Sequence, residues 1–186
     1  MATLPISHHL DPRLPNFFLA GVPKAGTTSL AAYLNQHPSV YMSKPKEPHF
    51  FEGQSYTKGI DFYVNTYFAN AESFPRRGDA TPSKLYEHTT VLPRLQVVYG
   101  STPLKFIVIF RDPVARAWSE YLHLVSTGEE VLGFDSALAA KAQRVTQPVS
   151  KQFHYICFAE SRRRMVNYSR GRQRYQLVKD PSNRRK

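Results

Sequence analysis

Two short segments of the chain carry residues that could bind phosphate groups. The first, Gly21 to Thr28 (GVPKAGTT), lies between an apolar run and a stretch with helical spacing. A glycine-containing loop before a helix offers backbone N–H groups and the helix dipole to an anion. Gly21 and Gly26 match the start of the Walker A phosphate loop, but Thr27 stands where that motif has lysine, which disfavours ATP or GTP hydrolysis. Lys24 should instead lie beside a bridging oxygen of a bound phosphoanhydride. Thr27 and Thr28 can cap the helix and donate their hydroxyls to the same anion. The alternative is a tight strand-to-helix turn with ordinary caps.

The second segment follows another apolar run, at Arg111. An arginine fork can donate two parallel hydrogen bonds to one anion. Ser119 follows Asp112, the proposed N-cap, by seven residues, which is about 10 Å along the predicted helix. Helical spacing places a set of polar residues on one face, opposite Trp118 and Val125: Asp112, Arg116, Ser119 and His123. Arg111 and Ser119 could therefore grip a second phosphate group. The alternative is an Arg111 paired with a carboxylate and an exposed Ser119.

Strands and helices that alternate must position these two loops. Strands are predicted at 16–20 and 105–110, each followed by a loop and a helix. Asp112 is a plausible N-cap, with Pro113 in the first helical position. Helices are predicted at 29–36, 90–99, 113–126 and 136–144, the last capped by Asp135. The third should bury four residues: Val114, Trp118, Tyr121 and Val125. This order favours an α/β domain with a parallel sheet.

Length and charge limit the class of protein. The chain has 186 residues, enough for one domain, and a formal net charge of +11. The last 36 residues hold 11 Lys and Arg against 2 acidic residues, so this segment is either an arm that binds anions or nucleic acid, or a solvated terminus. Cys157 is the one cysteine, which excludes an intrachain disulfide and an all-cysteine zinc site. The start lacks a signal-peptide pattern and no apolar run spans a bilayer, so a cytoplasmic location is expected.

Five segments in sequence order resemble the sulfotransferases that use 3′-phosphoadenosine-5′-phosphosulfate (PAPS), in particular the heparan-sulfate-type and bacterial branch. The loop at 21–28, with its helix and a His-Pro turn, resembles the 5′-phosphosulfate loop of that family. The segment at 107–123 is similar to its 3′-phosphate motif. Three further segments are similar to family sequences: KEPHFF at 46–51, KGIDFYVNTYF at 58–68 and GDATPSKLY at 78–86.

The resemblance implies a three-layer, P-loop-like domain with a central parallel sheet flanked by helices. It implies PAPS as co-substrate, no metal, and a hydroxyl or amine acceptor on a small molecule or carbohydrate. The cofactor-binding residues would be Lys24, Ala25, Gly26, Thr27, Thr28, Ser29, Arg111 and Ser119. Lys24 would neutralise the leaving group, and Glu47 would be the general base. His49 is the rival base, because imidazole titrates near neutrality.

Glu47 needs burial or a neighbour to raise its pKa, and the flanking Phe50 and Phe51 could supply burial. The family has Glu-Lys where this chain has Asp79 and Ala80, so one lysine contact is missing. The family also continues well past the 3′-phosphate helix, so a C-terminally truncated domain is expected. The predicted division is an N-terminal extension at 1–15, the sulfotransferase-like domain at 16–150 and a basic, poorly ordered segment at 151–186. Two alternatives to an active enzyme stay open: a weak or inactive nucleotide-binding homologue, and a nucleic-acid-binding module driven by the basic tail. Nucleic acid is the less favoured partner, and the oligomeric state is not predicted.

Overall fold

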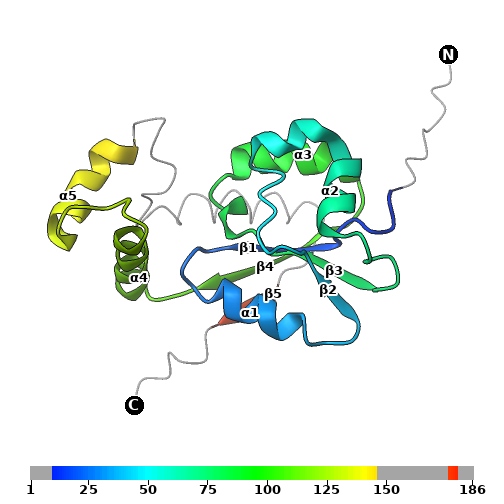
Figure 1. The fold of residues 1–186 in the computed structure, drawn as a ribbon, viewed down its shortest axis with the longest axis horizontal. Coiled ribbons are helices and arrows are strands. Elements are labelled where there is room, and N and C mark those ends of the chain that lie inside the picture. Colours follow the sequence, from blue (N-terminus) through cyan, green and yellow to red (C-terminus); the bar gives the residue numbers. More distant parts are fainter. Residues whose placement is uncertain (1–9, 146–175, 180–186) are drawn as a thin grey trace.

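A parallel sheet forms the centre of the fold (Figure 1). The computed structural model describes residues 10–145 and 176–179. The five strands lie in the order β2-β3-β1-β4-β5, and all neighbours are parallel. Their bounds are β1 Phe17–Gly21, β2 Val40–Met42, β3 Arg76–Asp79, β4 Lys105–Phe110 and β5 Gln176–Lys179.

Helices cover both faces of this sheet (Figure 1), which confirms the three-layer α/β architecture. Helix α1 (Thr27–Leu34) lies on one face, and α2 (Gly59–Tyr67) and α3 (His88–Tyr99) lie on the other. Two short 3-10 helices, η1 (Gln54–Lys58) and η2 (Pro82–Lys84), connect these layers. Helices α4 (Pro113–Ser126) and α5 (Phe134–Val145) extend beyond the carboxyl end of β4.

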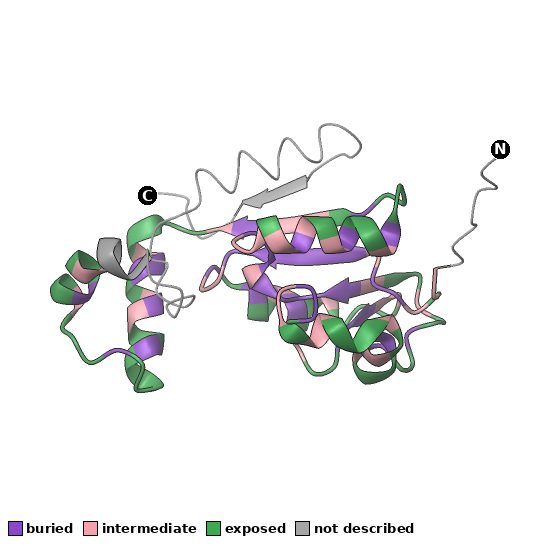
Figure 2. Cartoon of the chain, turned by 90° about the horizontal axis from the view of Figure 1, so that it is seen from above, coloured by how far each residue is buried: buried purple, intermediate pink, exposed green. Residues whose placement is uncertain are grey.

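Side chains of the central strand alternate between two cores, as the period of a strand requires. Phe18 packs with Phe51 and Tyr63 on the α2 and α3 face, whereas Phe17 and Leu19 pack on the α1 face. The first core is aromatic: the Phe50 and Tyr63 rings stack with centroids 4.3 Å apart. Figure 2 shows the buried strands between more exposed helices. Because β1 is buried on both faces, the site at its carboxyl end stands on a rigid support.

Several predicted elements agree closely with the structure. The strand at 105–110 is β4, and the strand predicted at 16–20 is β1, shifted by one residue. Asp112 caps α4, since its Oδ1 accepts a hydrogen bond from the Ala115 N–H at 2.9 Å. Helices α1 and α3 both begin two residues before their predicted starts, and Asp135 lies in the first turn of α5 instead of capping it. The strands β2, β3 and β5 and the helix α2 were not predicted as elements.

The predicted buried face of α4 is wrong. Val114, Trp118 and Val125 are exposed, with Trp118 at 47%. The buried residues of this helix are instead Arg116, Ala117, Glu120 and Leu124. Helix α4 runs past the end of the strands instead of packing back on the sheet (Figure 1). Its aromatic residues therefore pack locally, with the Trp118 and Phe134 rings 5.1 Å apart.

Candidate functional site

The loop after β1 has its shape fixed by two glycines. Gly21 has φ 144°, and a Cβ on it would lie 2.7 Å from the carbonyl oxygen of Pro82. Gly26 has φ 95° and occupies the N-cap position of α1 without a side-chain cap. Both backbone conformations favour glycine. The loop can therefore approach η2 closely and turn directly into the helix.

Contrary to the expectation from the sequence, Thr27 and Thr28 do not cap α1. They are its first two residues, and Gly26 precedes them. The first N–H groups of a helix have no partner within it and point towards any bound anion. The Ala25 N–H is already engaged, since it donates to the Val22 carbonyl at 3.2 Å. The amides available to an anion are therefore those from Gly26 onward.

The loop after β4 lies directly beside this first loop. Strands β1 and β4 are neighbours, and the Val22 N–H donates to the Ile109 carbonyl at 2.9 Å. Further out, Arg111 Nη1 donates to the Lys24 carbonyl oxygen at 3.1 Å. The two predicted phosphate-binding segments thus meet at the same edge of the sheet. The main chain of Lys24 also has φ 62°, a strained value that this contact helps to hold.

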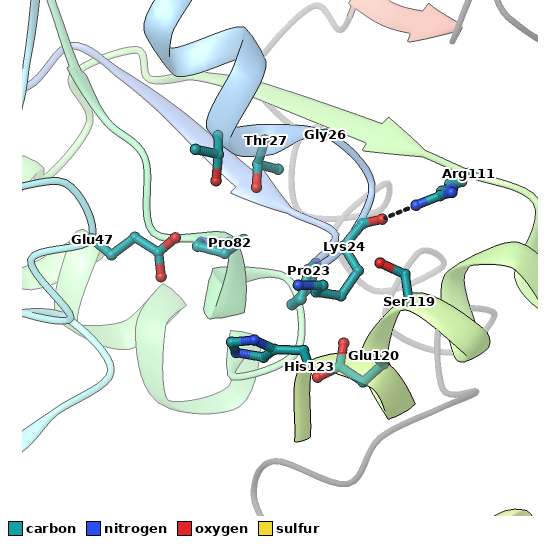
Figure 3. Close-up of a pocket in the computed structure, with 11 residues that line it drawn as sticks. Pro23, Lys24, Gly26, Thr27, Glu47, Pro82, Arg111, Ser119, Glu120 and His123 are labelled. Carbon is teal, nitrogen blue, oxygen red and sulfur yellow. Dashed lines mark hydrogen bonds between the residues drawn. The ribbon is translucent and has the colours of Figure 1, made fainter. Parts of the chain in front are cut away.

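A pocket of about 430 Å³ opens between these loops and α4 (Figure 3). Seven of the predicted site residues line it: Lys24, Gly26, Thr27, Thr28, Glu47, Arg111 and Ser119. Ala25 and Ser29 do not, because Ala25 is buried in the α1 core and Ser29 is exposed on the helix. In Figure 3, Lys24 lies between Thr27 and the α4 side chains, and Glu47 reaches the pocket from the other side.

Glu120 lines the pocket although the sequence did not single it out. It is 9% exposed, and its Oε2 lies 3.6 Å from Arg116 Nη1. Burial raises the pKa of the Glu120 carboxyl, against the opposing charges of Arg116, Lys24 and His123. The only signal in the sequence was its position next to Ser119 on an amphipathic helix. His123, four residues after Ser119, lines the same pocket as its predicted face suggests.

Glu47 sits in a strongly charged setting. It forms an ion pair with Lys46, and its Oε2 lies 3.4 Å from His49 Nε2. Burial alone would raise the pKa of Glu47, but hydrogen bonds from His49 and Lys46 lower it to about 2. The Glu47 carboxylate in turn raises the pKa of His49, against the effect of its burial.

The expectation that aromatic burial would raise the pKa of Glu47 is therefore wrong. Phe50 and Phe51 are fully buried in the core between the sheet and helices α2 and α3. They therefore do not cover the Glu47 carboxyl group. Both Glu47 and His49 have positive φ values, 61° and 47°, which are unusual for residues with a side chain. The segment that carries them is thus held in a constrained conformation.

The chain is an α/β domain with a glycine-shaped loop after its central strand and a strand-end arginine beside that loop. This arrangement is typical of domains that bind phosphate groups. Comparison with known proteins makes this specific. A family model described as "Sulfotransferase domain" matches residues 14–169. The chain therefore belongs to the sulfotransferase domain family.

Individual relatives agree with this assignment. The chain is 34% identical over 129 residues to the bifunctional heparan sulfate N-deacetylase/N-sulfotransferase 2 of Bos taurus, covering 64% of this chain and 14% of that protein. It is 32% identical over 123 residues to heparan sulfate glucosamine 3-O-sulfotransferase 5 of Mus musculus, covering 66% and 34%. A crystal structure of a sulfotransferase from Alicyclobacillus acidocaldarius superposes with a TM-score of 0.76 at 29% identity, covering 89% of this chain and 73% of that one.

The chain thus spans from 14% to 34% of the length of these two curated relatives. Another similar protein, 36% identical over 110 residues and covering 58% of this chain and 22% of that protein, is the membrane-associated sulfotransferase kil1 of Dictyostelium discoideum. Between residues 10 and 145, no helix of this chain has the length and apolar character that a bilayer crossing needs. The expected cytoplasmic location stays a prediction. The role expected for the basic segment at 151–186 also stays a prediction, because most of that segment lies outside the described residues.

The charge setting of Glu47 gives a testable titration. Replacing His49 by Gln removes one of the two groups that stabilise the ionised carboxylate, so the pKa of Glu47 should rise above about 2. A carbon-detected NMR titration of the carboxyl groups measures this directly. The matched control is His37→Gln, which changes an exposed histidine in the turn after α1. An unchanged Glu47 titration in His49→Gln would contradict the assigned contact.

Proposed function

We propose that this domain transfers a sulfuryl group from PAPS to a hydroxyl or amine group of a carbohydrate acceptor. The single observation that carries the proposal is the pocket in which Lys24, the first amides of α1, Arg111 and Ser119 converge. Membership of the sulfotransferase domain family supports the reaction type. The heparan sulfate enzymes among its relatives support glucosamine-containing polysaccharides as the first acceptors to try.

Two anion subsites in the pocket would take the two phosphate groups of an adenosine 3′,5′-bisphosphate unit. The amides of Gly26, Thr27 and Thr28, with the threonine hydroxyls, would bind the 5′-phosphate. Arg111 and Ser119 would bind the 3′-phosphate, which ATP lacks. One N–H group of Arg111 donates to the Lys24 carbonyl. The guanidinium has further N–H groups that could donate to a phosphate group. This arrangement would favour PAPS over ATP as the donor.

The reaction needs little more than positioning and charge stabilisation, as in phosphoryl transfer. The acceptor oxygen or nitrogen attacks sulfur, a new bond to sulfur forms, and the bond between sulfur and the bridging oxygen breaks. The electron pair of the broken bond stays on the phosphate oxygen of adenosine 3′,5′-bisphosphate. Lys24 would stabilise this developing charge, and Glu47 would accept the proton that the acceptor loses.

Glu47 suits this role as an ionised but weakly basic group. With a pKa of about 2 it is a carboxylate at neutral pH and can accept a proton without first losing one. In a loose transition state the bond from the acceptor to sulfur forms late, and the acceptor becomes acidic only as it forms. A weak base is then adequate. Binding of an acceptor that displaces Lys46 from Glu47 would raise the basicity of the carboxylate further.

Transfer of labelled sulfate from PAPS to N-desulfated heparan-type polysaccharides tests the proposal. Glu47→Gln should lower kcat by roughly 10²- to 10⁴-fold, the usual contribution of a general base. Lys24→Ala should lower it by about 10²- to 10³-fold, as expected for loss of one charge-stabilising group. Lys105→Ala, an exposed lysine at the start of β4, serves as the matched control with unchanged activity. Equal transfer by the wild type and both site variants would contradict the assigned mechanism.

The pH dependence distinguishes Glu47 from His49 as the base. If Glu47 accepts the proton, kcat/KM with a hydroxyl acceptor should stay level from about pH 8 to pH 5, because the carboxyl is ionised throughout. If His49 is the base, it must be neutral, and its pKa is raised above the ordinary value of about 6.5. The rate would then fall about tenfold per pH unit below that pKa. Such a fall, absent in His49→Gln, would assign the base to His49.

A further inference from the structure

A buried group of charged and polar side chains joins the segment that carries Glu47 to the end of β3. Lys84 is fully buried, and its Nζ donates to Glu52 Oε1 at 2.9 Å and to Asp79 Oδ1 at 3.0 Å. Asp79 is also fully buried, and the Glu52 side chain is 6% exposed. Removing these charges from water is costly unless they are paired. None of the three residues lines the pocket, so they have no direct part in binding its contents.

The two carboxylates in this group are held very differently. Asp79 accepts hydrogen bonds from the Thr81 N–H at 2.9 Å, the Thr81 hydroxyl at 2.7 Å and the Tyr63 hydroxyl at 2.7 Å. Burial would raise the pKa of Asp79, but Lys84 and these hydrogen bonds outweigh it and lower the pKa. Glu52 has Lys84 as its ion-pair partner, and its Oε2 has no hydrogen-bond partner among the described residues. Asp79 is thus held in place by several groups besides Lys84. Glu52 is held by its ion pair with Lys84.

Glu52 lies near the C-terminal end of the segment that carries Glu47, the proposed base. It follows Glu47 by five residues, and Glu47 and His49 between them hold two positive φ angles. Such backbone conformations persist only where the surrounding structure over-determines them. At the far end of the segment, Arg94 Nη1 donates to the carbonyls of Phe51 at 2.8 Å and Gly53 at 3.0 Å. Near the base itself, the His49 N–H donates to the Thr81 hydroxyl at a long 3.4 Å.

We propose that Lys84 and Glu52 are positioning residues for Glu47. The bridge from Glu52 through Lys84 to Asp79 fastens the segment 46–53 to the carboxyl end of β3, beside the two phosphate-binding loops. The identity of Glu47 as the base rests on the proposed function. The fastening of its segment does not.

Glu52→Ala is the informative variant, because it detaches the segment and leaves Lys84 paired with Asp79. The remaining pair is charge-balanced, so the fold should persist. The expected result is a fall in kcat of about 10- to 100-fold, the cost of a misplaced catalytic group. KM for PAPS should stay within about twofold, because the cofactor loops follow other strands. Glu52→Gln keeps an oxygen that can accept from Lys84 and should restore most of the activity. Glu72→Ala, at an exposed glutamate before β3, is the matched control.

Hydrogen exchange followed by mass spectrometry tests the fastening without reference to activity. In Glu52→Ala the amides of residues 46–53 should exchange faster, and those of residues 22–28 should not change. Unchanged exchange at 46–53, unchanged kcat, or a uniform rise in exchange across the chain would each overturn the proposal. A wild-type protein that transfers no sulfate would refute the proposed function instead, and the exchange comparison alone would then decide whether Lys84 and Glu52 position this segment.

Discussion

The contact between the carboxyl ends of β1 and β4 is the constraint on which the site depends. Two loops that are 87 residues apart in sequence meet because these strands are neighbours in a parallel sheet. The Val22 N–H to Ile109 carbonyl bond continues the strand pairing past β1, and Arg111 extends it to the Lys24 carbonyl. Ligands bind at this edge in open α/β sheets because loops and helix N-termini converge there. Without this adjacency, the two loops would not line one pocket.

The pocket is not simply basic. Lys24 and Arg111 face it, but so do the carboxylates of Glu47 and Glu120. Oriented amides and two placed cations can bind an anion in such surroundings, since fixed dipoles act over short distances without a large net charge. The third wall, the segment around Glu47, follows β2, and the buried ion pairs of Lys84 with Glu52 and Asp79 connect this segment to the end of β3.

Local signals in the sequence were sufficient for the elements that carry the two loops of the site. The apolar run of β4, the Asp112 cap and the spacing of Gly21 and Gly26 are short-range patterns, and they placed these elements close to where the structure has them. The strands β2 and β3 were not predicted because they are short, and Arg76 and Arg77 begin β3 without an apolar pattern.

The buried face of α4 depended on where the sheet ends, which no local pattern encodes. The burial of Lys84 and the charge setting of Glu47 likewise depend on contacts between distant segments. From sequence alone, a lysine or a carboxylate in a polar stretch is predicted to lie on the surface. Only the fold shows which charged partners surround it.

The central claim, that the loops after β1 and β4 form one site for an adenosine 3′,5′-bisphosphate unit, is tested most directly by thermal unfolding with two nucleotides. A ligand that binds only the native state stabilises it by about 2.7 kcal/mol at 100 times its Kd. Adenosine 3′,5′-bisphosphate should raise the melting temperature clearly more than adenosine 5′-monophosphate at equal concentration. Arg111→Ala should abolish this difference and retain the smaller shift given by the 5′-phosphate. Equal shifts by both nucleotides in the wild type, or no shift by either, would contradict the account.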